Sequence, residues 1–77
     1  ILKNRNFSGS MLVKDFNNEL GVILDADGNL TLSELIAGIL GHTPEYEDMV
    51  IIGNFEMTVT EATLKGAKMV RVSTIQP

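Results

Sequence analysis

The spacing of apolar residues changes once along this chain, and that change constrains the fold more than any other feature. In residues 12–20 and 32–40 the apolar residues recur every three to four positions, as on one face of a helix. After residues 42–48 comes a short apolar run at residues 49–52, and from Phe55 the apolar residues alternate with polar residues, as in strands that bury one face. Helices followed by closely spaced strands predict an α+β domain.

The first helical segment is expected over residues 10–21, after a short strand that ends within residues 4–9. Ser10 is placed to cap this helix through its hydroxyl group, and Gly21 stands at its C-terminal end. The apolar residues of the segment lie four apart: Leu12, Phe16 and Leu20. This pattern predicts a short amphipathic helix.

The second helix carries the clearest start signal in the chain. Thr31 and Glu34 have the spacing of a capping box, in which each side chain bonds to the other residue's backbone amide. A core-facing stripe follows: Leu32, Leu35, Ile36, Ile39 and Leu40. Gly41 ends the helix. Gly38 lowers helix propensity, so we expect it to let another backbone approach closely.

Three strands are expected after the second helix. Residues 49–52 form the first, and Gly53-Asn54 suits a two-residue hairpin turn. Residues 55–60 alternate apolar and polar side chains, Lys65-Gly66 turns the chain again, and residues 69–75 form the last strand. The expected order is β-α-α-β-β-β, with two short helices packed on a small antiparallel sheet.

Chain length and composition limit the possible class of protein. The 77 residues suffice for one domain, and we expect residues 1–77 to form it. The sequence starts at Ile1 without a methionine, which suggests a domain excised from a longer protein. No apolar run approaches the roughly 18 residues of a membrane span, so we expect no direct membrane insertion of this segment. Without cysteine, there is neither a disulfide nor a thiolate zinc site.

Charge is segregated along the sequence. All ten acidic residues lie between Asp15 and Glu61, a stretch without Lys or Arg, and the net charge is −4. Proteins that bind nucleic acid usually cluster basic residues on one face. We therefore expect no nucleic-acid partner, and interpret the acidic stretch as a solvated surface that aids solubility.

The stretch DADGNLTLSEL, residues 25–35, resembles a calcium-binding EF-hand loop at first sight. Asp25, Asp27 and Asn29 occupy the first three ligand positions of that motif. Leu30, however, stands where the motif needs glycine, and Ile36 stands where it needs a bidentate glutamate. We interpret the stretch as a polar turn followed by the start of the second helix, with Glu34 committed to the cap.

Residues 42–48 are the other place where a metal hypothesis arises. His42, the only histidine, lies near Glu45, Glu47 and Asp48, but their spacing matches no known ligand set. One histidine without cysteine offers little for nucleophilic catalysis, and there is no glycine-rich phosphate loop. We therefore predict no catalytic residues, no metal site and no resident cofactor, and leave open which residues would line any ligand site.

Several ordered letters resemble the CorC/HlyC transporter-associated domain, over about residues 7–75. The opening GSMLVKDFNNELG, the helix led by Thr31, the Thr43-Pro44 step and the acidic turn at Glu47-Asp48 follow the family's order. The matching positions at the close of the chain are Gly53, Phe55, Val59, Glu61, Lys68, Val70, Arg71 and Val72.

This resemblance implies a cytoplasmic domain at the C-terminal end of a bacterial inner-membrane protein. Family members follow a transmembrane domain and CBS domains in proteins associated with magnesium and cobalt efflux, and related copies end some potassium or sodium/proton antiporters. The resemblance also implies a fold similar to part of flavin-binding domains, and a role in modulating ion transport. It supplies no catalytic residues.

Two hypotheses of function follow. The first is a non-catalytic regulatory domain that binds the membrane and CBS domains of its parent transporter, or a second copy of itself as a homodimer. The second is a ligand sensor that binds a divalent cation, or an adenine or flavin nucleotide, between the helices and the sheet. An independent enzyme ranks last.

Overall fold

The computed structural model describes residues 4–75, which form four strands and two helices in the predicted order. The N-terminal half contains strand β1 (Arg5–Ser8) and helices α1 (Val13–Leu20) and α2 (Leu32–Leu40). The remaining strands are β2 (Met49–Ile52), β3 (Phe55–Thr63) and β4 (Gly66–Thr74). The α+β prediction is confirmed.

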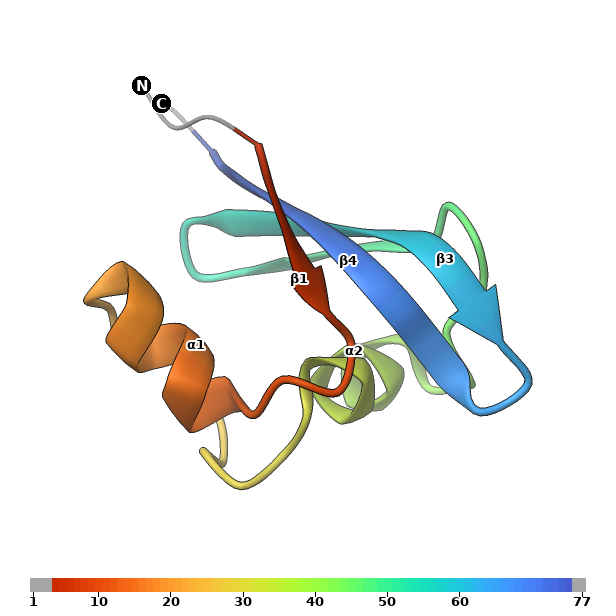
Figure 1. Ribbon diagram of the computed structural model, residues 1–77, viewed down its shortest axis with the longest axis horizontal. Helices are drawn as coiled ribbons and strands as arrows, with labels where there is room; N and C mark the ends of the chain where they lie inside the picture. The colour runs from red at the N-terminus through yellow and green to blue at the C-terminus, as the bar shows by residue number, and fades with distance from the viewer. Residues whose placement is uncertain (1–3, 76–77) are drawn as a thin grey trace.

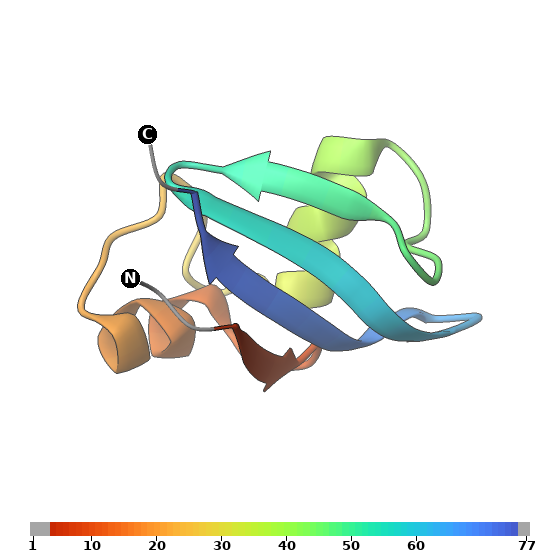
Figure 2. The ribbon, with the colours of Figure 1, turned by 90° about the horizontal axis from the view of Figure 1, so that it is seen from above.

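The strands make one antiparallel sheet in the order β1-β4-β3-β2. Strands β2, β3 and β4 follow one another as a meander, while β1 pairs with β4 from the other end of the chain. Both helices lie on one side of the sheet (Figure 1). Figure 2 looks onto the sheet, with α2 behind β2 and β3. Among residues 4–75, no helix covers the opposite face of the sheet.

The first helix begins later than predicted, and Ser10 does not cap it. The residue before the first turn is Leu12, without a side-chain capping bond, and the Ser10 hydroxyl lies 2.8 Å from that of Ser8. The cause is a competing pairing of the preceding backbone with the start of α2. The Leu32 amide donates to the Met11 carbonyl at 2.9 Å, which keeps this segment extended.

The second helix begins as predicted, with a complete capping box. The Glu34 amide donates to the Thr31 hydroxyl at 3.0 Å, and the Thr31 amide donates to the Glu34 carboxylate at 2.8 Å. Two of the four amides that a helix start leaves without partners are commonly satisfied in this way. The helix ends at Gly41, whose φ of 80° is left-handed.

Gly38 does not serve the close approach that we predicted for it. A Cβ at Gly38 would meet nothing within 4 Å, because this residue lies on the exposed side of α2. The close approach occurs instead at Gly9, just after β1, where a Cβ would collide with the Ala67 carbonyl group. The Gly9 amide donates to the Lys68 carbonyl, and its carbonyl accepts from the Ser33 amide, both at 2.9 Å. Gly9 therefore joins β1, β4 and α2.

Of the two predicted hairpin turns, one is at the predicted residues and the other is shifted. The turn at Gly53-Asn54 is confirmed, and the φ of 58° at Gly53 suits a turn with glycine at its first central position. The second turn falls one residue earlier than predicted, because Thr63 pairs with Gly66. Gly66 is thus the first residue of β4, and both strands of this hairpin extend further than their alternating apolar cores.

Three phenylalanines tie the layers together at the centre of the core. Phe16 of α1, which is fully buried, packs edge-on against Phe7 of β1 and Phe55 of β3. The ring centroids are 5.2 and 5.7 Å apart, within the range of favourable aromatic pairs. The ion pair of Arg5 with Glu19, at 3.1 Å, also joins β1 to α1, but it is exposed and contributes little to stability.

Within residues 4–75 neither helix is long and apolar enough to cross a membrane.

Substitution of two glycines by alanine should have opposite effects on stability. Gly9→Ala should lower the free energy of unfolding by about 1–3 kcal/mol, because the methyl group has no space beside Ala67. Gly38→Ala should raise it by about 0.5–1 kcal/mol, because it stiffens an exposed helical position. Urea denaturation of both variants measures these changes, and effects of the same sign would contradict the packing described.

Candidate functional site

The stretch that resembles an EF-hand loop is a polar turn whose side chains bond within the stretch itself. The Asp27 carboxylate accepts from the Asn29 amide at 2.9 Å, and Glu34 is engaged in the capping box. Asp25 is exposed. The structure thus confirms that Glu34 serves the start of α2.

The loop between α2 and β2 contains the histidine and three of the acidic residues. His42 is exposed, and its Nδ1 lies 3.0 Å from the carbonyl of the next residue. The Asp48 carboxylate accepts from the Glu45 amide at 2.9 Å, so it stabilises the loop's own turn. In the part of the chain that the structure describes, no three His, Asp or Glu side chains gather where they could hold a metal ion.

Glu47 adopts a backbone conformation that is costly for a residue with a side chain. Its φ is 70°, and among residues 4–75 it is the only residue other than glycine with a positive φ. The Glu47 amide donates to the Val59 carbonyl, and the Val59 amide donates to the Asp48 carbonyl, both at 2.8 Å. Two residues oppose one in this arrangement, as in a β-bulge whose first position is usually glycine. The bulge fixes where β2 begins.

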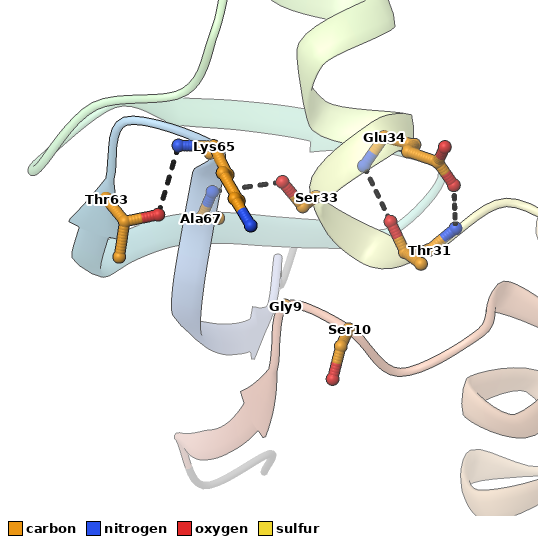
Figure 3. A pocket seen from close by; sticks show the side chains of 9 residues that line it. Gly9, Ser10, Thr31, Ser33, Glu34, Thr63, Lys65 and Ala67 are labelled. Carbon is orange, nitrogen blue, oxygen red and sulfur yellow. Dashed lines mark hydrogen bonds between the residues drawn. The ribbon is translucent and has the colours of Figure 1, made fainter.

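A shallow hollow lies between the start of α2 and the β3–β4 hairpin (Figure 3). Its volume is about 300 Å³, and hydroxyl groups, Lys65 and the Glu34 carboxylate line it. The hydroxyl groups are already engaged: Ser33 accepts from the Ala67 amide at 2.9 Å, and Thr63 accepts from the Lys65 amide at 3.1 Å. The hydroxyl groups of this hollow therefore stabilise the fold, and with Lys65 they form no arrangement of nucleophile and base.

A second hollow, of about 450 Å³, lies where the loop after α1 meets the β2–β3 turn. Its lining is mostly apolar and includes Leu24, Ile52 and Phe55. Ile23 stands at this hollow with 94% of its surface exposed. The hollow has the size of a small-ligand cleft, but Asp25, Asn54 and Thr74 are the only lining residues with polar side chains.

On the face of the sheet without helices, exposed apolar residues lie at the β2 edge and polar residues lie at the β1 edge. Met49 and Ile51 of β2 point to this face, with 46% and 55% of their surfaces exposed. Met49 pairs with Thr58 of β3, which pairs with Arg71 of β4, which in turn pairs with Asn6 of β1. Apolar surface on this face therefore lies along β2, at the edge of the sheet.

The sequence did not predict that Met49 and Ile51 are exposed while Val50 is buried, because residues 49–52 are all apolar. Their exposure depends on β2 being an edge strand, and strand order is decided by long-range pairing. The signal that could have identified them is the absence of a charge on the outward-facing positions of residues 49–52.

The sequence matches a family model over nearly its whole length. The model describes the transporter associated domain CorC/HlyC, and the match covers residues 5–76. No curated protein matches the sequence significantly.

Solved structures with the same fold come from several bacteria. A region described as associated with a CorC-type Mg²⁺ and Co²⁺ transporter of Neisseria meningitidis is 20% identical, with a TM-score of 0.84 over 95% of this chain and 90% of that one. A CorC/HlyC domain from Nitrosomonas europaea is 15% identical (TM-score 0.83, 96% and 95% covered). One from Haemophilus ducreyi is 13% identical (TM-score 0.81, 97% and 100% covered). These likenesses support the fold.

Replacement of Glu47 by glycine should stabilise the protein, because glycine adopts the positive φ without steric cost. We expect Glu47→Gly to raise the free energy of unfolding by about 0.5–1 kcal/mol. Glu47→Ala removes the same charge but keeps the strain, so it is the matched control and should give no such gain. Equal stabilisation by both variants in urea denaturation would show that charge repulsion, rather than backbone strain, is relieved.

Proposed function

The chain belongs to the CorC/HlyC family of transporter-associated domains, and we propose that it is a non-catalytic regulatory domain that modulates ion transport by its parent membrane protein. The observation that carries this proposal is the family match over residues 5–76. The parent would be a magnesium or cobalt efflux protein, in keeping with the description of the Neisseria structure. A potassium or sodium/proton antiporter is the alternative parent.

The residues of the domain support a role in binding proteins rather than in chemistry. The hydroxyl groups of Thr31, Ser33 and Thr63 and the Glu34 carboxylate around the first hollow are occupied by hydrogen bonds to backbone amides. No buried polar side-chain atom within residues 4–75 lacks a hydrogen-bond partner, so none is held ready for a ligand. The available features are a sheet face without helices and exposed carboxylates such as those of Glu45 and Glu47, which suit contact with another protein.

The proposal places the domain at the cytoplasmic face of the bacterial inner membrane, as part of a longer chain. Its partners would be the membrane and CBS domains of the same protein, with a homodimer as the other option. The apolar edge along Met49 and Ile51 would supply contacts, while the acidic surface would discourage phosphate-rich partners.

Removal of this domain from the parent protein should change the rate of cation transport in reconstituted vesicles. A parent with Gly9→Val is the matched control, because the larger side chain at this crowded position should unfold the domain without shortening the chain. Both proteins should show the same altered rate. Transport that equals that of the intact parent in both cases would contradict a regulatory role.

The second hypothesis, a ligand sensor, is supported by the hollow of about 450 Å³ beside Phe55. A ligand that binds only the native state must raise the melting temperature. If the regulatory role rests on protein contacts alone, the melting temperature of the isolated domain should not change with millimolar Mg²⁺ or Co²⁺, or with adenine or flavin nucleotides. A rise that is lost when Phe55 is changed to Leu would instead establish a ligand site in this hollow.

A further inference from the structure

Strand β2 is an edge strand whose outer hydrogen-bonding groups have no partner within residues 4–75. The sheet order β1-β4-β3-β2 leaves one side of β2 without a neighbouring strand. Figure 2 shows this strand at the border of the sheet, with α2 lying behind it rather than beside it. An uncovered edge of this kind can accept an additional strand.

The pairing of β2 with β3 determines which backbone groups point outward. Asp48 accepts from the Val59 amide, and Ile52 and Phe55 close the two-residue hairpin. Because inward and outward groups alternate along an antiparallel pair, the amide and carbonyl groups of Met49 and Ile51 point away from β3. The edge therefore offers two donors and two acceptors.

The same two residues carry apolar side chains on the helix-free face. Met49 and Ile51 each leave about half of their surface exposed. Natural edge strands are often protected by lysine, proline or inward-pointing charges, and β2 contains none of these; its protection is limited to its length of four residues and to the bulge at Glu47 just before it. The backbone and side chains of this edge are thus both suited to an incoming extended segment.

The other edge of the sheet differs in both respects. On β1 the outward-pointing residues are Asn6 and Ser8, which are polar. The Ser8 carbonyl already accepts from the Met11 amide at 3.1 Å. The edge at β2 is therefore the more available one and the more apolar one.

The negative charge around the β2 edge favours a basic incoming segment. Glu45 and Glu47 are exposed at the beginning of β2, Asp48 is half-buried beside them, and Glu56 is the cross-strand partner of Ile51. Neither β2 nor β3 contains Lys or Arg to balance them, and Arg71 of β4, the cross-strand partner of Thr58, lies one strand further away on the same face. A second copy of this chain would bring the same acidic groups to the interface, whereas a basic segment would neutralise them.

We propose that β2 is a docking edge for an extended, Lys- or Arg-bearing segment of the parent protein, which adds to the sheet as a fifth strand. The inference rests on the proposed function for the source of the segment. Cytoplasmic segments next to membrane spans carry an excess of Lys and Arg, so a transporter has segments of this chemistry within reach of such a domain. Alternate apolar side chains of the segment would lie beside Met49 and Ile51, with its basic residues near Glu47 and Asp48.

Titration of the isolated domain with the synthetic peptide KKVTVTVKK, followed by NMR, tests the docking edge. Solved structures of separate CorC/HlyC domains of the same extent show that such domains fold alone. The peptide should shift the resonances of Met49 and Ile51 and slow the exchange of their amide protons. The peptide EEVTVTVEE is the matched control and should bind at least about tenfold more weakly, because its charges oppose those around the edge.

A pair of lysine variants separates this edge from the rest of the helix-free face. Ile51→Lys places a positive charge where the peptide should dock, and the exposed position makes it compatible with folding. Asn6→Lys adds the same charge at the opposite edge of the same face. We expect the first to weaken binding of the lysine peptide at least about tenfold, and the second to change it less than about twofold.

Three results would overturn the proposal. The first is equal binding of the two peptides, and the second is a set of resonance shifts that does not include Met49 and Ile51. The third is amide exchange at these two residues that becomes slower as the concentration of the domain rises, in the absence of peptide. The last would assign the edge to a second copy of the chain. The titration involves no transport, so a failure to bind the peptide would not contradict the regulatory role. Conversely, transport that is unchanged when the domain is removed would not contradict peptide binding.

Discussion

The contacts of Gly9 hold the helical layer to the sheet, and the remaining structure depends on them. Its amide bonds to Lys68 of β4 and its carbonyl accepts from Ser33 of α2, while the Ser33 hydroxyl accepts from the Ala67 amide. This arrangement leaves no space for a side chain at Gly9, because a Cβ there would collide with the Ala67 carbonyl group. With α2 fixed in this way behind the sheet, the opposite face and the β2 edge are left to contact other molecules.

Elements with strong local signals could be predicted from the sequence. The capping box at Thr31 and the alternation from Phe55 onward depend on neighbouring residues alone, and both are confirmed. Ser10 was wrongly predicted as a cap because the backbone of Met11 pairs with Leu32, and such pairing between distant residues overrides a local preference. The likeness to flavin-binding domains stays a prediction.

The position of β1 and the role of Gly38 could not be derived for a related reason. Whether residues 5–8 join the sheet depends on β4, which lies at the other end of the chain. The face of α2 that meets another backbone likewise depends on how the helix is placed, and Gly38 lies on its exposed face. Long-range pairing thus decided the points that periodicity left open.

The difference between local signals and long-range pairing also explains why the sequence did not identify the candidate binding surface. Acidic and hydroxyl groups stand out in the sequence, but Glu34, Asp27 and Asp48 are used in caps and turns that stabilise the fold. The edge that we propose for docking carries two exposed apolar residues, Met49 and Ile51, and its availability appears only once β2 is known to be an edge strand. The strain at Glu47 lies at the start of this same strand.

The central claim is that this domain acts by contact with its parent protein through the edge of its sheet. Residue-resolved amide hydrogen exchange, measured on the intact parent and on the isolated domain, tests it most directly. We predict that the amides of Met49 and Ile51 exchange rapidly in the isolated domain and are strongly protected in the parent. Equally rapid exchange of both amides in the two proteins would contradict the account.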